Sequence, residues 1–201
     1  MSNKILVWDI PTRLFHWLLA VSFIGAYLTA ESEYWRALHV ALGYTVLGLI
    51  GFRLIWGFVG TRYARFSAFS FGPSKVLAYL KSLVRKSPEH YVGHNPAGSW
   101  VIYGLLLLGL LAGATGYATY AEIGGKWLED LHEVVSNLML ALVLVHIAGV
   151  LVSSYLHQEN LVRGMITGYK QGASGQGISR VYMLLGIGLL LAVVALWGAL
   201  Y

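Results

Sequence analysis

Four of the seven histidines lie in or at the ends of strongly apolar stretches, and they are the residues best suited to chemistry. They are His16, His39, His132 and His146. An ionisable side chain inside a membrane-spanning stretch is costly and is a functional-site candidate by default. His132 and His146 share one stretch and are fourteen residues apart. On a helix this spacing corresponds to about 21 Å along the axis and to ~1400° of rotation, so the two side chains share one helix face and point in directions that differ by only about 40°. That face presents imidazoles at two depths, and the other two histidines could complete two pairs.

The elements that must position these histidines are membrane-spanning helices. The chain has 201 residues, of which 57% are hydrophobic and only 11% charged, a composition that excludes a soluble domain of this size. Five stretches are long enough to cross a hydrocarbon core of ~30 Å as helices. The sequence predicts an all-α membrane protein, a four-helix transmembrane bundle plus a fifth C-terminal helix, with spans at Pro11–Ala30, Ala37–Val59, Ser99–Tyr120, Leu131–Leu156 and Val181–Leu200.

Basic residues predict which end of each span faces the cytoplasm. They concentrate before the first span and in the connections after the second and fourth, whereas the short connections 31–36 and 121–130 and their edges are mainly acidic. By the positive-inside rule the N-terminus is cytoplasmic and the C-terminus faces outward. The net charge of +5 reflects this bias, so we expect a lipid membrane as partner and no nucleic acid.

Helix direction then decides which histidines can pair. His16 lies near the cytoplasmic start of the first span, and His39 near the outer start of the second. The fourth span also starts outside, which places His132 in the outer layer and His146 in the inner half. We therefore expect His39 to pair with His132 and His16 with His146. His146 is deeper than His16 by this count, a mismatch that tilt or an extended fourth helix could absorb.

Two imidazoles at each depth favour haem over another metal. Facing helices commonly build a cofactor site in a bundle core, and two axial histidines saturate the iron, which suits electron transfer. A zinc or copper site would need three or four ligands at one depth. Because the sequence has no cysteine, two haem b groups held by ligation and packing are predicted. Each histidine could instead be a hydrogen-bonded packing residue, though four at matched depths argue against that jointly.

Haem propionates are anionic and are typically bound by arginine or polar donors near the membrane surface. Arg13 and Arg53 are placed to bind those of the inner haem, and Arg36 those of the outer haem. Arg13 and Arg36 could equally be simple interfacial charges. Glycines of the second and third spans could open space for a porphyrin or could allow close helix packing; they are Gly43, Gly48, Gly51, Gly104, Gly109, Gly113 and Gly116.

Several short motifs together resemble one family. They are Val7-Trp8-Asp9, Pro11-Thr12-Arg13-Leu14-Phe15-His16-Trp17, Gly51-Phe52-Arg53-Leu54-Ile55-Trp56-Gly57, Gly93-His94-Asn95-Pro96 and Leu156-His157-Gln158-Glu159-Asn160-Leu161. The chain resembles the bacterial cytochrome b561 / Ni–Fe hydrogenase b-type cytochrome family from about Ile5 to Gly168. The combination is specific, although each motif is weak alone.

The resemblance implies a four-helix dihaem core that moves electrons between the quinone pool and a partner redox protein, such as a hydrogenase or a c-type cytochrome. It places the haem-iron ligands at His16, His39, His132 and His146, and the protein in a bacterial inner (cytoplasmic) membrane. The chain would serve as an electron-transfer subunit or a quinone oxidoreductase, and the resemblance does not identify the partner.

The domain organisation follows from these segments. Residues 1–168 form the haem domain, 169–177 a Gly- and Ser-rich tether, and 178–201 the fifth span. In the long connection before the third span, apolar residues between 76 and 84 recur at helical spacing among basic residues, which predicts an amphipathic helix on the inner leaflet. Asn95 can cap the third span, with Pro96 at its first position.

Two features bear on the partners. The cytoplasmic edge offers polar groups for a quinone, at His94, Asn95, His157, Glu159 and Asn160. The outer connections carry acidic residues suited to a basic periplasmic redox protein, at Glu31, Glu33, Glu122, Glu129, Asp130 and Glu133. The acidic residues could also be ordinary solvated charges. Likewise, His90, His94 and His157 could be ordinary surface histidines.

The competing function is a histidine-lined metal or ion transporter, which the largely apolar residues between the two depths disfavour. A membrane anchor without a cofactor would leave the histidine geometry unexplained.

Overall fold

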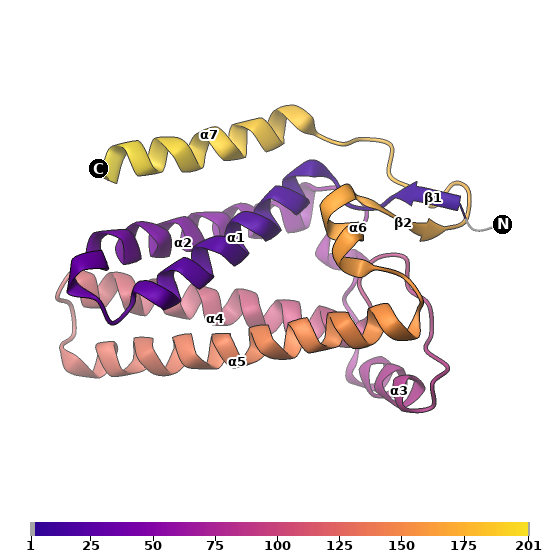
Figure 1. Cartoon of the computed structure of the whole chain (residues 1–201), viewed down its shortest axis with the longest axis horizontal. Coiled ribbons are helices and arrows are strands. Elements are labelled where there is room, and N and C mark those ends of the chain that lie inside the picture. Colours follow the sequence, from indigo (N-terminus) through magenta and orange to yellow (C-terminus); the bar gives the residue numbers. More distant parts are fainter. Residues whose placement is uncertain (1–2, 201) are drawn as a thin grey trace.

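The computed structural model describes residues 3–200 and is built mainly from long antiparallel helices. Helices α1, α2, α4 and α5 lie side by side, and α7 runs along the α1–α2 side (Figure 1). In chain order the elements are β1 (Asn3–Leu6), α1 (Ile10–Thr29), η1 (Glu33–Trp35), α2 (Arg36–Val59), η2 (Phe66–Ala68), α3 (Pro73–Val84), α4 (Pro96–Tyr120), α5 (Lys126–Leu156), α6 (Leu161–Thr167), β2 (Tyr169–Gly172) and α7 (Met183–Leu200).

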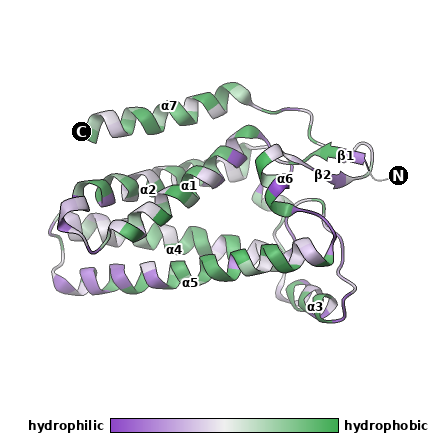
Figure 2. Cartoon of the chain, in the orientation of Figure 1, coloured by the Kyte–Doolittle hydropathy of each residue, from purple (hydrophilic) through white to green (hydrophobic). Residues whose placement is uncertain are grey.

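The two ends of the bundle differ in character. At one end, here called the short-loop end, residues 30–35 join α1 to α2 and residues 121–125 join α4 to α5 (Figure 1). The opposite end of the bundle, here called the strand end, holds β1, β2, α3 and α6. Figure 2 shows mainly hydrophobic helices, with a hydrophilic stretch at the start of α5 on the short-loop end. The all-α prediction is therefore confirmed, apart from one short ribbon of strands.

Among residues 3–200, four of the five predicted spans are long and apolar enough to cross a membrane: the span Glu33–Val59, which includes α2, and helices α4, α5 and α7. The helix count differs in part from the prediction, because α1 is not among them. Helix α1 has 20 residues, but Arg13 and His16 lower its mean hydropathy. Helix α5 also begins five residues earlier than predicted, at Lys126 instead of Leu131. Its 31 residues correspond to about 46 Å, well beyond a ~30 Å hydrocarbon core.

The predicted tether over residues 169–177 is wrong in its first part. Tyr169–Gly172 forms β2, which pairs antiparallel with β1 in a register that joins Asn3 to Gly172 and Leu6 to Tyr169. Gly168, at the C-terminus of α6, has a φ of +88°, which a glycine adopts without strain. This left-handed turn directs the chain from α6 into the strand. Residues 1, 2 and 201 of the predicted domains lie outside the described residues.

Helices α3 and α4 confirm two local predictions. Helix α3 is the expected amphipathic helix, with Tyr79 buried and Leu77, Leu80 and Val84 exposed. At the start of α4, the Asn95 side chain accepts a hydrogen bond from the Gly98 amide at 2.7 Å, and Pro96 occupies the first turn. The cap satisfies a donor that the helix itself leaves unpaired.

Asp9 ties the start of α1 to the end of α2, and no part of it is exposed. It caps α1 by accepting from the Thr12 amide at 2.8 Å. It also accepts from Trp56 Nε1 at 3.2 Å and from Thr61 Oγ1 at 2.6 Å. A buried carboxylate with three donors is well satisfied, so Asp9 fixes the strand end of the α1–α2 pair.

We expect Asp9→Ala to destabilise the protein, because three buried donors would lose their acceptor and an unsatisfied buried donor costs about 1–3 kcal/mol. Thermal unfolding in detergent should show a transition several degrees lower. Asp130→Ala, which removes an exposed aspartate on α5, is the control. Equal transition temperatures for the two variants would contradict this role for Asp9.

Candidate functional site: two imidazole pairs

The structure brings the four apolar histidines together in two pairs. At the short-loop end, the ring centres of His39 on α2 and His132 on α5 lie 6.2 Å apart with an interplanar angle of 88°. At the strand end, those of His16 on α1 and His146 on α5 lie 6.3 Å apart with an angle of 53°. These are the pairs that helix direction predicts.

Backbone carbonyls orient the rings of the short-loop pair. His39 Nδ1 lies 2.8 Å from the Ala26 carbonyl oxygen, and His132 Nδ1 lies 3.0 Å from that of Ala112. A carbonyl oxygen can only accept, so each Nδ1 must donate, and each neutral ring keeps its lone pair on Nε2. Metal-ligating histidines commonly have this arrangement, because the second bond fixes the tautomer and the ring orientation.

The separation of each pair fits one iron between the rings. A metal–imidazole bond is about 2.0 Å long, and the ring centre lies a further ~1.1 Å beyond the nitrogen. Two imidazoles bound to one metal from opposite sides would therefore have ring centres roughly 6.2 Å apart. The structure gives 6.2 and 6.3 Å.

One glycine leaves space beside the short-loop pair. Gly43 follows His39 by four residues on α2, so it shares a helix face with that histidine, and it is half-buried. A Cβ at this position would meet nothing within 4 Å. Gly149 follows His146 by three residues but is exposed on the surface of α5. At the strand end, His16 Nδ1 is buried with no hydrogen-bond partner among the described residues.

The predicted glycines divide by helix. Gly43, Gly48 and Gly51 on α2 are open, whereas those of α4 allow close packing, because a Cβ at Gly104 or Gly113 would lie 2.8 Å from a leucine side chain of a neighbouring helix. A Cβ at Gly116 would lie 2.9 Å from Cε1 of His132. This glycine is therefore required for the position of a candidate ligand ring.

The three candidate arginines have different surroundings. Arg53 is 3% exposed and its guanidinium lies over the Phe66 ring, 4.8 Å from the ring centre. Arg13 donates from Nη1 to the Ile166 carbonyl at 2.6 Å. Arg36 is largely exposed and forms a 3.8 Å ion pair with Glu33. The structure thus places Arg13 and Arg53 at the strand end as predicted, while Arg36 is an exposed charge already close to a carboxylate.

The polar groups predicted at the cytoplasmic edge are mostly engaged in structural contacts. Besides the Asn95 cap, Asn160 caps α6 by accepting from the Arg163 amide at 2.8 Å. Glu159 pairs with Lys170 at 3.4 Å, with both side chains buried. Burial lowers the pKa of Lys170, while the neighbouring Glu159 carboxylate opposes this shift. His157 Nε2 lies 3.4 Å from the Tyr79 hydroxyl.

His94 differs from these groups, and the sequence analysis underestimated it. Its ring lies between two aromatic rings, with centres 4.7 Å from that of Trp8 and 4.3 Å from that of Phe69. Its Nδ1 is buried without a hydrogen-bond partner. Burial, and secondly the positive charge of Arg53, lower the pKa of His94 to about 3, so the ring is neutral at physiological pH. The sequence placed His94 in the Gly93-His94-Asn95-Pro96 motif and among the polar groups offered to a quinone, but it gave no sign of the burial between aromatic rings.

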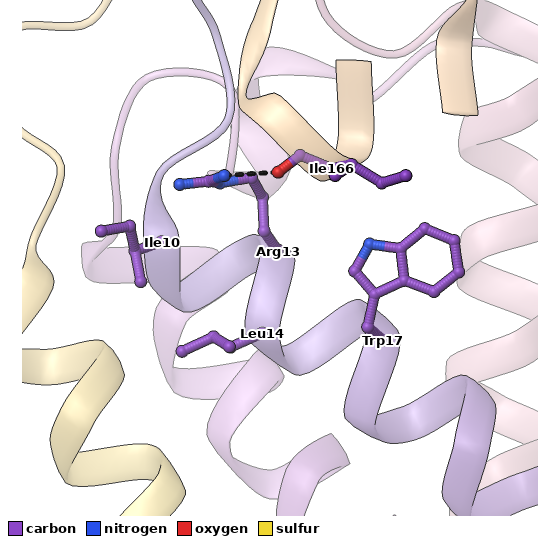
Figure 3. A pocket seen from close by; sticks show the side chains of 5 residues that line it. All are labelled: Ile10, Arg13, Leu14, Trp17 and Ile166. Atoms are coloured by element: carbon purple, nitrogen blue, oxygen red, sulfur yellow. Dashed lines mark hydrogen bonds between the residues drawn. The ribbon is translucent and has the colours of Figure 1, made fainter. Parts of the chain in front are cut away.

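A groove of about 470 Å³ lies beside the strand-end pair. Figure 3 shows its lining, Ile10, Arg13, Leu14 and Trp17 from α1 and Ile166 from α6, with the Arg13 hydrogen bond to Ile166 along one edge. Trp17 follows His16 directly, and their ring centres are 5.0 Å apart. The groove is mainly apolar with one cationic edge, and it reaches close to a candidate ligand.

Within residues 3–200, no group of three or more histidine, aspartate or glutamate side chains is placed to hold a metal ion. The residues between the two pairs are apolar and packed, with Phe23, Leu49, Ile50 and Met139 among the buried core. The polar Asn137 on α5 is engaged by Tyr27, whose hydroxyl donates to it at 2.8 Å. The core between the two pairs is thus mainly apolar, with Ser22 and Thr45 as buried polar residues of α1 and α2.

Known proteins resemble the chain over most of its length. A family model described as prokaryotic cytochrome b561 matches residues 7–168. A probable Ni/Fe-hydrogenase B-type cytochrome subunit from Azotobacter vinelandii is 28% identical over 217 residues, covering 84% of this chain and 89% of that protein. The protein of the same name from Azotobacter chroococcum mcd 1 is 33% identical, and the match covers 65% of this chain and 66% of that protein. The probable Ni/Fe-hydrogenase 1 B-type cytochrome subunit of Escherichia coli (strain K12) is 24% identical, and the match covers 85% of this chain and 92% of that protein. No solved structure gave a significant match.

We expect Gly116→Ala to disturb the short-loop pair alone, because the added methyl group would push the His132 ring from its place and break its bond to Ala112. Electron paramagnetic resonance should then show one low-spin haem signal altered and the other unchanged. Gly188→Ala on α7, where a Cβ meets nothing within 4 Å, is the matched control. Two unaltered signals in Gly116→Ala would contradict this packing argument.

Proposed function

The chain belongs to the prokaryotic cytochrome b561 family, and on that premise we propose that it is a dihaem b-type cytochrome that transfers electrons between the quinone pool and a partner redox protein. The observation that supports this most directly is the pair of imidazole sites at opposite ends of one bundle, with ring centres 6.2 and 6.3 Å apart. His39 and His132 would hold one haem, and His16 and His146 the other.

The chain's own residues limit the chemistry at both sites. Haem, when bound, supplies an iron centre that accepts and releases one electron. With two histidine ligands the iron would have no open position, which would favour electron transfer over oxygen chemistry. The apolar core between the pairs excludes water and keeps both centres in a low-dielectric surrounding. Thirteen intervening residues of α5 set their separation at about 21 Å along the axis.

The position of the protein in the membrane is part of the proposal. Helix α1 lies alongside α2 and carries His16 opposite His146, so we place it in the membrane with the four long apolar helices (Figure 1). Basic residues of the connection between α2 and α4 lie at the strand end, which we assign to the cytoplasmic side of a bacterial inner membrane. The short-loop end and the C-terminus would then face the periplasm.

The partner is proposed from the relatives and the charge of the short-loop end. Several relatives are named as Ni/Fe-hydrogenase B-type cytochrome subunits, so a hydrogenase-like protein is one partner we propose, and a c-type cytochrome another. Glu31, Glu33, Glu129 and Asp130 are exposed at that end. An acidic surface of this kind attracts a basic soluble partner.

The strand end is better suited to the quinone. The groove between α1 and α6 is largely apolar, as the ring and tail of a quinone require, and Arg13 on its edge can donate a hydrogen bond (Figure 3). It lies next to His16. By contrast, the packed core between the pairs gives no support to the alternative of a histidine-lined metal or ion transporter.

Haem stoichiometry and single substitutions test the function. Pyridine haemochrome titration should give two haems per chain, both low-spin. His39→Ala and His132→Ala should each remove only the short-loop haem, and His16→Ala and His146→Ala only the strand-end haem, because each variant lacks one of two axial ligands. His90→Ala, outside both pairs, should keep both. One haem or none in the unaltered protein would refute the proposal, and loss of the same haem in His132→Ala and His16→Ala would refute the pairing.

Neutralising the exposed acidic residues tests whether the partner that exchanges electrons with this protein docks at the short-loop end. We expect Glu31→Gln, Glu33→Gln, Glu129→Gln and Asp130→Asn together to slow electron exchange with a basic periplasmic partner and to weaken its salt dependence, because the attractive field is reduced. Stopped-flow reduction by a quinol should be unchanged, since the quinone is assigned to the other end. An unchanged, salt-insensitive rate with the partner would defeat docking at the short-loop end.

A further inference from the structure

Buried polar atoms without partners collect at the strand end. Among residues 3–200, six buried side-chain nitrogen or oxygen atoms have no hydrogen-bond partner. One, Thr119 Oγ1, lies near the short-loop end of α4. The other five lie around the strand end of the bundle: Thr12 Oγ1, Arg13 Nε, His16 Nδ1, Arg53 Nη1 and His94 Nδ1. Buried polar atoms are normally paired, so such a concentration points to a missing hydrogen-bonding group. The two arginine nitrogens can only donate, so that group must include an acceptor.

Arg53 and His94 are the two members that share a neighbour. The Arg53 guanidinium lies 5.8 Å from the centre of the Phe69 ring, and the His94 ring centre lies 4.3 Å from it. Arg53 is 3% exposed, so its guanidinium is largely shielded from bulk solvent. An unpaired buried cation is among the costliest arrangements in a folded protein.

Nearby carboxylates are already engaged. Asp9 interacts with Arg53 through space, but its oxygens accept from Thr12, Trp56 and Thr61, and it forms no ion pair within 4.0 Å. Glu159 pairs with Lys170 and accepts from the Gln171 amide at 2.7 Å. Neither side chain therefore supplies the acceptor that Arg53 Nη1 and His94 Nδ1 lack.

We propose that Arg53 and His94 form a pocket that binds one propionate carboxylate of the haem held by His16 and His146. This inference rests on the proposed function and adds His94 to the residues that hold the cofactor. A carboxylate is an acceptor-only anion with two oxygens, so it can accept from both nitrogens at once. The surroundings of His94 also include His16 and His146, with which it interacts electrostatically.

The two residues have different tasks in the pocket. Arg53 provides the positive charge that a buried carboxylate requires. His94 is neutral, because its pKa is lowered to about 3, and it contributes one N–H donor without adding a second cation. Trp8 and Phe69 fix its ring between them. His94 is thus a cofactor-binding residue that links the loop before α4 to the strand-end site.

Two substitutions separate the donor from the packing. His94→Phe keeps an aromatic ring between Trp8 and Phe69 but removes the donor. His94→Asn loses the ring but keeps an N–H group near the place of Nδ1, because the asparagine amide nitrogen is also two bonds from Cβ. His90→Phe, in the same connection and exposed, is the matched control. Redox titration of the purified holoprotein, with the two haems resolved spectroscopically, gives a midpoint potential for each.

We expect His94→Phe to lower the midpoint potential of the strand-end haem only, because a less stabilised propionate charge disfavours the reduced iron. Transfer of that haem to apomyoglobin should be about tenfold faster, the loss expected for one hydrogen bond to a charged group. His94→Asn should restore much of both values, and His90→Phe should match the unaltered protein.

Three results would overturn the pocket. Unchanged potential and unchanged haem loss in His94→Phe would show that the orphan donors serve another anion, such as a lipid headgroup or free phosphate. Equal shifts of both haems, or no recovery in His94→Asn, would assign His94 a packing role alone. Absence of haem in the unaltered protein would instead refute the proposed function itself, so the two failures are distinguishable.

Discussion

Both imidazole pairs hold their ring centres slightly more than 6 Å apart, and a single helix, α5, supplies one member of each. This requirement limits the rest of the bundle. Helix α5 must be straight and long enough to carry His132 and His146 at two depths, and its partners must approach from opposite ends. The antiparallel α1 and α2 provide this, because His16 is near the start of α1 and His39 near the start of α2. A change in direction of either helix would separate the pair to which that helix contributes.

The two sites are constructed differently despite their equal spacing. At the short-loop end the protein itself orients the rings, through the carbonyl oxygens of Ala26 and Ala112. Ala26 lies in the last turn of α1, where a helix has carbonyl groups without an internal partner. At the strand end, His16 Nδ1 has no such partner and other donors nearby are also unpaired. One site is complete in its polar contacts, whereas the other depends on a further group to satisfy them.

Local and directional features of the sequence predicted much of this arrangement, and long-range contacts account for what it did not predict. The pairing followed from helix direction, and the start of α4 from Asn95 and Pro96. The ribbon was missed because β2 pairs with a strand more than 160 residues away in the chain, and a Gly- and Ser-rich segment carries no sign of that partner. The importance of Asp9 and His94 was also hidden, because burial among Trp56, Thr61, Trp8 and Phe69 exists only in the folded chain. The roles of the four histidines and of Arg13, Arg36 and Arg53 as cofactor contacts stay predictions.

Charge gives the two proposed sites unequal affinities for an electron. An electron added near the strand-end pair is attracted by Arg53, which is 3% exposed and therefore weakly screened by water. The acidic residues at the short-loop end repel an added electron, but they are exposed, as is Arg36 beside Glu33, so solvent and salt weaken their effect. A propionate bound to Arg53 would balance much of this charge, so the affinity of the strand-end site for an electron depends on how firmly Arg53 and His94 hold that carboxylate. The acidic surface and the apolar groove are separate proposals, and they concern where a partner and a quinone bind.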